Sequence, residues 1–400
     1  MLKKIPVFRL TTGMYIHDLN CGWMDHPFMA NRFAIDDVET LRKIQAMGVL
    51  EVYIDTSRGL DVADESTAAA AADTEPSAPR AGKPAREVPR RTGGTQPAEL
   101  LRVRKLHGEA TRLVAEMMQD VRLGRQIELE KCEPVVEEIV VSIFRKPDLL
   151  LPLLQVKTRD EYTFQHSVAA AALAAAFGRT LNVPRDVIRE VAIGGLLHDV
   201  GKAMLPDSLL KKPGKLTHEE YELVKGHVDF GTSVLKNTTG LSEIAYQAVA
   251  EHHERFDGTG YPCGLKGDDI SIYGQMLAIV DVYDAITSLR PYHKPIPPTE
   301  ALRSLFEWSK CQFNPTLVQA FIKGIGIYPA GSLVRMESGR LGVVREVVPD
   351  RLLQPVVKVF YDATKHSYMA PRIVELAAGD DKIVAHESFE HWNIDQAAWL

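Results

Sequence analysis

The chain contains few cysteines, no long apolar run and no excess of basic residues. Its cysteines, Cys21, Cys132, Cys263 and Cys311, lie far apart and form no CxxC pair. This spacing argues against a thiolate zinc site and against a disulfide framework. No apolar signal segment follows the basic N-terminus, and the most apolar stretch, 168–177, is too short to span a bilayer. We therefore expect a cytoplasmic protein without a membrane partner.

The charge balance of the chain is mildly acidic, with a formal net charge of -6. Long nucleic acids are not expected as partners, because proteins that coat them present a broad basic surface. A local basic pocket for a small phosphate ligand remains compatible with this balance. Hydrophobic residues make up 45% and charged residues 25% of the chain, as in ordinary globular domains. The 400 residues are enough for two or three domains.

Residues 1–60 have the pattern of a small α/β domain. Segments 14–19 and 50–55 are predicted to be strands. Between them, Asp36 is predicted to cap a helix that ends at Gly48. Nothing here has the spacing of a catalytic site, so we expect an accessory or regulatory role.

Residues 61–97 are rich in alanine and proline. Such a composition cannot bury enough apolar surface to offset chain entropy, so we predict a disordered linker. Residues 98–147 then have a strongly charged helical pattern and are predicted to be connecting helices. Their apolar stripe either forms a dimer seam or packs against the following domain. The stripe consists of Leu106, Leu113, Val114, Met117 and Val121.

Residues 148–325 read as consecutive helices joined by short loops, which favours a compact bundle. Pro184 is predicted to occupy the first position of a helix. Thr217 and Glu220 form a capping-box pattern, and Asn314-Pro315 is a cap followed by proline in the first turn. In 326–400, segments 332–336, 341–347 and 355–361 are predicted to be strands. The predicted fold class is mainly α, with a helical-bundle catalytic domain between the small α/β domain and a small β-rich tail.

Five histidines and two aspartates stand out within the helical region, because they lie in apolar segments that otherwise exclude charge. An isolated histidine on an apolar helix is more often a packed core residue than a ligand. Two buried carboxylates, however, are costly without a partner, and a metal ion suits both carboxylates and neutral imidazoles. The candidate metal ligands are His166, His198, Asp199, His227, His252, His253 and Asp281.

The number of candidate ligands favours two metal ions. Seven ligands exceed what one octahedral ion accepts while it keeps positions for substrate and water. If Asp199 bridges the ions, each ion takes three of the others. The two sets are His166, His198 and Asp281, and His227, His252 and His253. Two ions about 3.5–4 Å apart can clamp a phosphodiester and hold a bridging hydroxide for in-line attack. Nitrogen-rich ligation without cysteine suits iron, manganese, zinc or nickel better than magnesium, and the mixture of histidines and carboxylates makes iron or manganese the preferred metals.

Two basic residues are candidates for phosphate binding. Lys202 follows Asp199 by three positions and returns to the same face if the helix continues that far. It can neutralise a non-bridging phosphate oxygen, and so can Arg290, which follows the helix of Asp281. The alternative for each is a solvated surface cation.

The loop after His252-His253 is the third candidate element. Gly260 permits a close backbone approach, Tyr261 offers a ring for stacking on a base, and Pro262 stiffens the turn. Alone this is a turn-rich loop, but its place directly after two candidate ligands indicates a surface that faces substrate or a partner.

These residues together resemble the HD-GYP family of cyclic di-GMP phosphodiesterases, a branch of the HD-domain phosphohydrolases. The resemblance covers about residues 148–325 and depends on an ordered set of motifs. They are His166, the run from His198 to Lys202, His227, the string from His252 through Pro262, Gly264-Leu265 and the run from Asp281 to Ala285. Residues 1–60 also resemble a domain of unknown function often found ahead of HD-GYP domains, through Trp23, His26-Pro27-Phe28 and Ile54-Asp55.

The resemblance implies hydrolysis of cyclic di-GMP to linear pGpG, with onward cleavage to GMP left open. It implies that the seven candidate ligands bind metal and that Lys202 and Arg290 lie near phosphate. The family often has another basic residue three positions after the arginine, where this chain has His293 beside Lys294. Binding of diguanylate cyclase (GGDEF) domains through the Gly260-Tyr261-Pro262 loop is compatible with the resemblance, and so is a homodimer.

Two other functions remain as alternatives. One is an HD phosphohydrolase that acts on a mononucleotide or alarmone, against which the Gly260-Tyr261-Pro262 loop argues. The other is a cyclic di-GMP receptor or interaction scaffold without turnover. Loss of a metal ligand would mark such a receptor, and all seven candidates are present.

The residue one helical turn before His166 bears on the number of metals. Some HD-GYP proteins carry a glutamate there that helps to hold a third ion, and this chain has Tyr162. A neutral phenol is a poor substitute for a bridging carboxylate. Glu161 lies about 100° further round a helix, unless an irregular start lets Glu161 or Asp160 swing in. We therefore predict a binuclear site, with Tyr162 lining the pocket.

Overall fold

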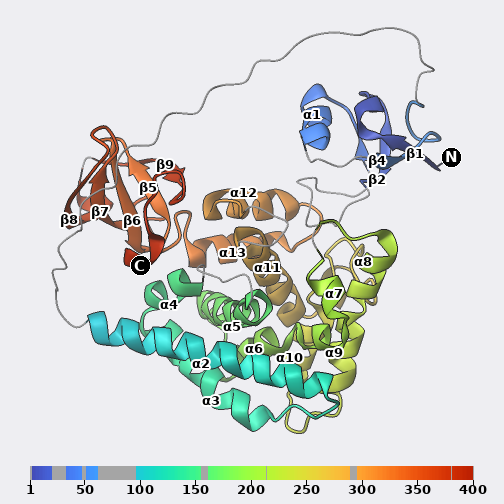
Figure 1. Ribbon diagram of the computed structural model, residues 1–400, viewed down its shortest axis with the longest axis horizontal. Helices are drawn as coiled ribbons and strands as arrows, with labels where there is room; N and C mark the ends of the chain where they lie inside the picture. The colour runs from blue at the N-terminus through green and yellow to red at the C-terminus, as the bar shows by residue number, and fades with distance from the viewer. Residues whose placement is uncertain are drawn as a thin grey trace. The chain divides into compact units, whose positions relative to one another are not determined.

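The structure is a computed structural model that describes residues 2–19, 33–46, 51–61, 96–154, 161–212, 214–288, 295–379 and 381–399. The chain forms two compact units, and the second contains everything from Arg102 onward (Figure 1). Most of the predicted linker 61–97, together with Trp23, His26-Pro27-Phe28, Arg290 and His293-Lys294, lies outside the described residues.

In its described residues, the N-terminal unit is a four-stranded antiparallel sheet with one α-helix and the short 3-10 helix η1 (Val7–Arg9). Its elements are β1 (Leu2–Pro6), β2 (Tyr15–Asp18), β3 (Phe33–Ala34), α1 (Val38–Ala46) and β4 (Glu51–Asp55), and the strand order is β1-β4-β2-β3. Ile16 and Ile54 pair across the sheet and are fully buried with Ile44 of α1. The two predicted strands are confirmed. The predicted cap is wrong by one residue: because α1 begins at Val38, Asp37 rather than Asp36 accepts the N–H of Thr40, at 2.6 Å.

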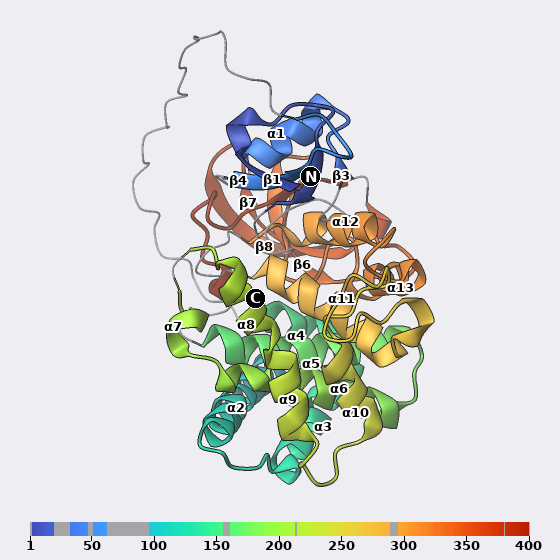
Figure 2. The ribbon, with the colours of Figure 1, turned by 90° about the vertical axis from the view of Figure 1, so that its right-hand side faces the viewer.

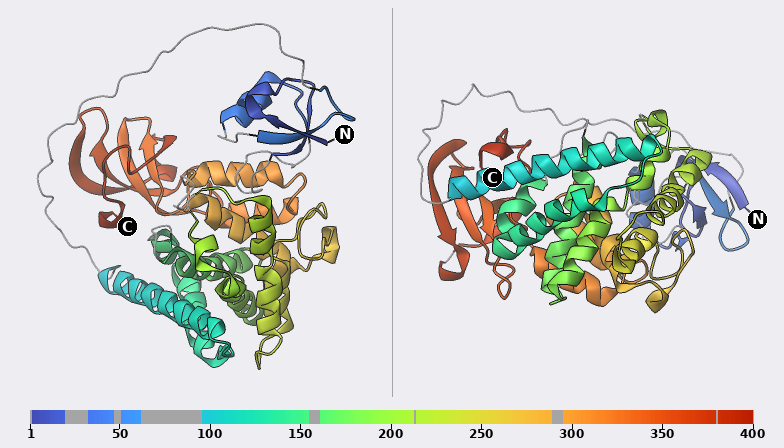
Figure 3. Two further views of the ribbon diagram at one scale, coloured as in Figure 1. Left: turned by 45° about the vertical axis from the view of Figure 1, so that its right-hand side comes forward. Right: turned by 90° about the horizontal axis from the view of Figure 1, so that it is seen from below.

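Two long helices, α2 (Gln96–Arg122) and α3 (Leu129–Arg145), open the second unit, and Figure 3 shows α2 as an extended rod. Four residues of the predicted apolar stripe of α2 are buried in one hydrophobic cluster with residues of α3, α5 and α6, and the fifth, Leu113, is partly buried against it. The stripe therefore packs within its own unit, as one of the two sequence interpretations expected, because amphipathic helices are stabilised mainly by burying their apolar face.

The helical bundle follows in the region where consecutive helices are predicted. Its elements are α4 (Pro147–Leu154), α5 (Tyr162–Thr180), α6 (Arg185–Leu197), η3 (Val200–Met204), α7 (Asp207–Leu210), α8 (His218–Lys225), α9 (His227–Leu235), α10 (Glu243–Glu251), η4 (Gly267–Asp269), α11 (Ile272–Thr287), α12 (Pro298–Trp308) and α13 (Pro315–Ile325). Thr217 closes the predicted capping box with Glu220, and the Asn314 side chain caps α13. Pro184 is the residue before α6 rather than its first residue, because its ψ of 143° is extended.

The alanine-rich helix α5 is the centre of the bundle. Its residues from Gln165 to Gly178 are all buried, and α5 contacts α6, α11, α3 and α13 (Figure 2). Small side chains allow this close packing. A Cβ on Gly195 of α6 would lie 3.0 Å from the Ala171 backbone of α5, and one on Gly194 would lie 2.7 Å from Ala248 of α10. The Gly194-Gly195 pair thus brings α6 against two helices just before it ends at Leu197, next to His198-Asp199.

The C-terminal sheet has five antiparallel strands in the order β8-β7-β6-β5-β9. They are β5 (Leu333–Met336), β6 (Arg340–Glu346), β7 (Val356–Asp362), β8 (Ser367–Glu375) and β9 (Ile383–Glu387). The three predicted strands are confirmed, and β8 and β9 were not predicted. Both are edge strands, and β8 contains Pro371 and is largely exposed, so its sequence lacks the buried alternation that marks a strand. Among the described residues, no helix has the length and apolar character needed to cross a bilayer.

Candidate metal centre

The seven predicted ligands come together from five elements of the bundle. His166 lies in the first half of α5, and His198-Asp199 directly follow α6. His227 is the first residue of α9, His252-His253 follow α10, and Asp281 lies within α11. All seven are buried, and none is more than 8% exposed. Segments far apart in sequence therefore place every predicted ligand in one region of the bundle.

The imidazole rings are oriented by hydrogen bonds on their Nδ1 side. Nδ1 of His198 lies 2.8 Å from the carbonyl oxygen of Gly195, and Nδ1 of His227 lies 2.7 Å from that of Val224. Nδ1 of His252 lies 2.6 Å from the carbonyl oxygen of Val249. Because a carbonyl only accepts, Nδ1 carries the proton in each neutral ring and Nε2 presents a lone pair. This is the arrangement in which protein histidines bind metal.

His166 is oriented by a carboxylate instead. Its Nδ1 lies 2.6 Å from Oδ2 of Asp284, and its Nε2 lies 2.9 Å from Oδ1 of Asp281. Asp284 was not predicted as a site residue, although it stands one helical turn after Asp281 in the quoted motif. That spacing was the available signal, since residues three apart share a helix face.

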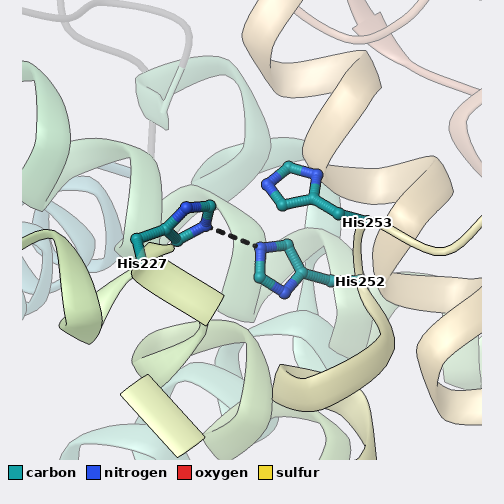
Figure 4. A group of neighbouring side chains, drawn as sticks. All are labelled: His227, His252 and His253. Atoms are coloured by element: carbon teal, nitrogen blue, oxygen red, sulfur yellow. Dashed lines mark hydrogen bonds between the residues drawn. The ribbon is translucent and has the colours of Figure 1, made fainter. Parts of the chain in front are cut away.

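The ligand atoms form two groups, each compact enough to hold one ion. The first contains His166, His198 and Asp199, and the second contains the three histidines drawn in Figure 4. In the second group the rings turn toward one another, with Nε2 of His227 and of His252 3.4 Å apart. Lone pairs that face each other at this distance repel, and a cation between them removes the repulsion. The donor set therefore fits metal ions.

Two carboxylates connect the groups. Oδ2 of Asp199 lies 3.4 Å from Nε2 of His198, and its Oδ1 lies 3.5 Å from Nε2 of His227. Oδ1 of Asp199 is buried and has no hydrogen-bond partner among the described residues. A buried carboxylate oxygen without a partner is costly, which indicates that a cation belongs beside it. Asp281 spans the groups in a similar way, because its Oδ2 lies 3.8 Å from Nδ1 of His253.

The pKa shifts of the candidate ligands show which protonation states they favour in the folded chain. Burial, with repulsion from Lys202, lowers the pKa of His227 to about 4, and burial with repulsion from His198 lowers that of His252 to about 3. Burial opposes ionisation of Asp199, but His198 and Lys202 outweigh it and hold the pKa of Asp199 well below its ordinary value. At neutral pH His227 and His252 are thus neutral imidazoles and Asp199 is an ionised carboxylate, which are the forms that bind metal. His198 differs: burial opposes its charged form, but Asp199 and Asp281 outweigh burial and raise the pKa of His198, so a metal ion at its Nε2 displaces a proton.

Lys202 lies beside the candidate ligands, as predicted, but it does not belong to a continuation of α6. Helix α6 ends at Leu197, and Lys202 belongs to the short 3-10 helix η3. Its Nζ lies 2.6 Å from Oδ2 of Asp199, and its side chain is 23% exposed. Gly201 makes this possible, because a Cβ there would collide with the carbonyl oxygen of His227. The other predicted cation, Arg290, lies outside the described residues.

The predicted loop folds back onto the last ligand pair. The ring of Tyr261 stacks on that of His253, with centroids 4.7 Å apart and an angle of 29° between the rings. Lys225 Nζ lies 5.6 Å from the centroid of the Tyr261 ring. Gly260 is partly buried, and Pro262 is exposed beside it. Neither Lys225 nor the neighbouring Glu254 was singled out from the sequence, because nothing in their spacing indicates what they contact.

The start of α5 bears on the predicted number of metals. Tyr162 stacks on His166, with ring centroids 5.8 Å apart and nearly parallel planes. Glu161 is exposed, and its Oε2 accepts a hydrogen bond from Gln165 at 3.0 Å. Asp160 lies outside the described residues.

Two family models match the chain. A domain of unknown function, DUF3391, matches residues 2–132, and an HD domain matches residues 149–317. The HD match covers the part of the chain that carries all seven candidate ligands.

Named relatives are similar over different lengths. A Pseudomonas aeruginosa protein named as a cyclic di-GMP phosphodiesterase is 42% identical over 98% of this chain and 94% of its own length. A Vibrio cholerae protein named as a 3'3'-cGAMP-specific phosphodiesterase is 41% identical over 32% of this chain and 24% of its own length. Among solved structures, an HDG"Y"P protein from Bdellovibrio bacteriovorus is 16% identical, with a TM-score of 0.47, over 80% of this chain and 98% of that one.

Proposed function

Because the chain belongs to the HD-GYP family of cyclic di-GMP phosphodiesterases, we propose that it hydrolyses cyclic di-GMP at the metal centre on its helical bundle. The observation that carries this proposal is the convergence of five histidines and two aspartates. Nδ1 of His198, His227 and His252 is paired with a backbone carbonyl, and Oδ1 of Asp199 has no hydrogen-bond partner among the described residues. The product is linear pGpG, and further cleavage to GMP is a question for the same assay.

We propose two metal positions, loaded with iron or manganese. His166, His198 and Asp281 hold one, His227, His252 and His253 hold the other, and Asp199 lies between them. Metal ions at such positions supply Lewis acidity for a phosphodiester and lower the pKa of water. The placement of Tyr162 on His166 and of Glu161 toward Gln165 supports two ions rather than three.

The chain's own residues supply orientation and charge. Asp284 and the backbone carbonyls fix the imidazole rings, so that little reorganisation is needed during reaction. Lys202 pairs with Asp199 in the structure and, as a flexible ammonium, can turn to a non-bridging phosphate oxygen when substrate binds. Tyr261 offers its ring to a base, and Arg290 is proposed as a further phosphate contact.

A turnover assay tests the proposal most directly. Purified protein loaded with defined iron or manganese is incubated with cyclic di-GMP, and the products are separated by chromatography. Asp199→Ala is the negative control, because it removes the carboxylate that lies between the groups, and it should lose both turnover and metal. Full activity in a metal-replete Asp199→Ala protein would overturn the site assignment.

Metal analysis on anaerobically purified protein gives the stoichiometry, which we expect to be two ions per chain. A third ion near Tyr162 or Glu161 would refute the binuclear site. Absence of turnover in a fully loaded protein that still binds cyclic di-GMP would instead favour a receptor.

A second substrate deserves comparison, because a Vibrio cholerae relative is named as specific for 3'3'-cGAMP. A panel of cyclic di-GMP, 3'3'-cGAMP, a mononucleotide and an alarmone distinguishes the candidates by kcat/KM.

We also propose the exposed part of the loop, from Pro262 to Gly264, as a surface for GGDEF domains. Titration of labelled GGDEF protein, and the oligomeric state by light scattering, test that partner and a homodimer.

A further inference from the structure

Glu254 directly follows the ligand His253, and its side chain binds the returning part of the loop. Its Oε1 accepts the backbone N–H groups of Cys263 at 2.7 Å and of Gly264 at 3.1 Å, and its Oε2 accepts that of Leu265 at 3.0 Å. Glu254 is only 3% exposed. Hydrogen bonds to a carboxylate are stronger than neutral ones, so this buried residue ties the loop to the end of α10.

The loop also packs against the backbone of residues 253–254. A Cβ on Gly260 would come within 2.5 Å of the Glu254 Cα, so only glycine fits this approach. The next residue, Tyr261, donates its N–H to the carbonyl oxygen of His253 at 3.1 Å. Residues 260–265 are therefore held on residues 253–254 by side-chain and main-chain contacts together.

This attachment places an aromatic ring on a metal ligand. The ring of Tyr261 stacks on the imidazole of His253 at 4.7 Å, and that imidazole belongs to the group with His227 and His252. If the loop moves, Tyr261 leaves the ring it covers, and the imidazole gains freedom to turn away from the metal position.

We propose that Glu254 is a positioning residue that couples the conformation of the loop to the metal position of His227, His252 and His253. The proposal rests on the proposed function, since it takes these histidines to bind a metal ion. Groups that orient a metal-bound histidine typically change metal affinity by about 10–100-fold. A partner that pulls the loop outward would therefore weaken this position and leave the position at His166 unchanged.

Metal binding and amide exchange together test the coupling. The variant is Glu254→Gln, whose amide group places a donor against backbone N–H groups. Its matched control is Glu251→Gln, because Glu251, the last residue of α10, likewise accepts a backbone N–H, from Ser271 at 2.7 Å, outside the loop. Tyr261→Ala removes the stacked ring without touching the carboxylate, and Tyr261→Phe keeps the ring.

The measurements are Mn²⁺ isotherms by calorimetry and hydrogen exchange of the 257–266 peptide. We expect Glu254→Gln to expose the amides of 263–265 to exchange and to weaken one of two Mn²⁺ binding steps by about 10–100-fold. Tyr261→Ala should weaken the same step, whereas Tyr261→Phe and Glu251→Gln should match the wild type.

Four outcomes would contradict the proposed coupling or the function on which it rests. Faster exchange in Glu254→Gln with unchanged Mn²⁺ binding would overturn the coupling, and so would unchanged exchange. Equal loss of both binding steps would make Glu254 a general structural residue. If the wild type itself binds no Mn²⁺, the proposed function fails rather than this inference alone.

Discussion

Nδ1 of His166 lies 2.6 Å from Oδ2 of Asp284, and this contact joins α5 to α11 at the metal centre. Asp281, one turn earlier on the same helix, lies 2.9 Å from Nε2 of the same ring. One helix thus provides both a candidate ligand and the carboxylate that orients another ligand. His198, His227 and His252 have backbone carbonyls in the corresponding position.

We predict that Asp284→Asn weakens metal binding at the position of His166 by about 10–100-fold, because the ring loses a charged orienting partner. Calorimetric titration with Mn²⁺ should show the loss in one binding step only. Asp268→Asn, a change at an exposed carboxylate, is the control. An isotherm of Asp284→Asn identical to that of the wild type would show that Asp284 does not act on the metal.

Lys202→Met should reduce turnover about 10²–10³-fold, because one donor to the phosphate charge is lost in a partly buried site. The metal content should stay near that of the wild type, since the seven candidate ligands remain. Lys211→Met, at a lysine whose side chain is 79% exposed, is the matched control. Metal analysis accompanies the kinetics, and loss of the ions in Lys202→Met would make Lys202 a structural residue.

Asp148, in the first turn of α4, gives a prediction for pH dependence. Burial, with repulsion from Glu346, raises its pKa from the ordinary 3.8 to about 6. The folded state then binds this proton more tightly than the unfolded state. The contribution of Asp148 to stability is therefore complete below about pH 4 and is lost as the pH rises through about 6.

Asp148→Asn removes this titration. The free energy of unfolding of the variant minus that of the wild type should rise by about 1–3 kcal/mol when the pH is raised from 4 to 7.5, because only the wild type loses stability as Asp148 ionises. Urea denaturation of both proteins at pH 4 and at pH 7.5 measures this change. A difference that is independent of pH would contradict the assignment.

A chain that begins at Gln96 should fold and retain turnover. The division into two units and the start of α2 support this position for the truncation, and the N-terminal sheet has its own buried residues. Circular dichroism and the cyclic di-GMP assay are compared with the full chain. An insoluble or inactive product would show that the N-terminal unit is part of the catalytic fold.

The sequence by itself determined the features that depend on local chemistry. Thr217 with Glu220 and Asn314 with Pro315 were predicted as caps, because a cap and its helix are neighbours in the chain. The ligand types were evident for a similar reason: charged or imidazole groups in the apolar segments before His198 and around Asp281 require an unusual partner. The edge strands β8 and β9 were not predicted, because exposed strands lack the alternation of apolar and polar residues on which strand prediction depends.

Only the tertiary structure decided which groups act on the ligands. His166 and Asp284 are 118 positions apart in sequence, and their contact exists because small residues let α5 pack closely within the bundle. Glu254 could have faced solvent, and its burial against three backbone N–H groups depends on the path of the loop. Lys202 reaches Asp199 through a 3-10 turn rather than a continued helix. Residue types follow from the sequence, but hydrogen-bond partners depend on distances that packing between distant segments sets.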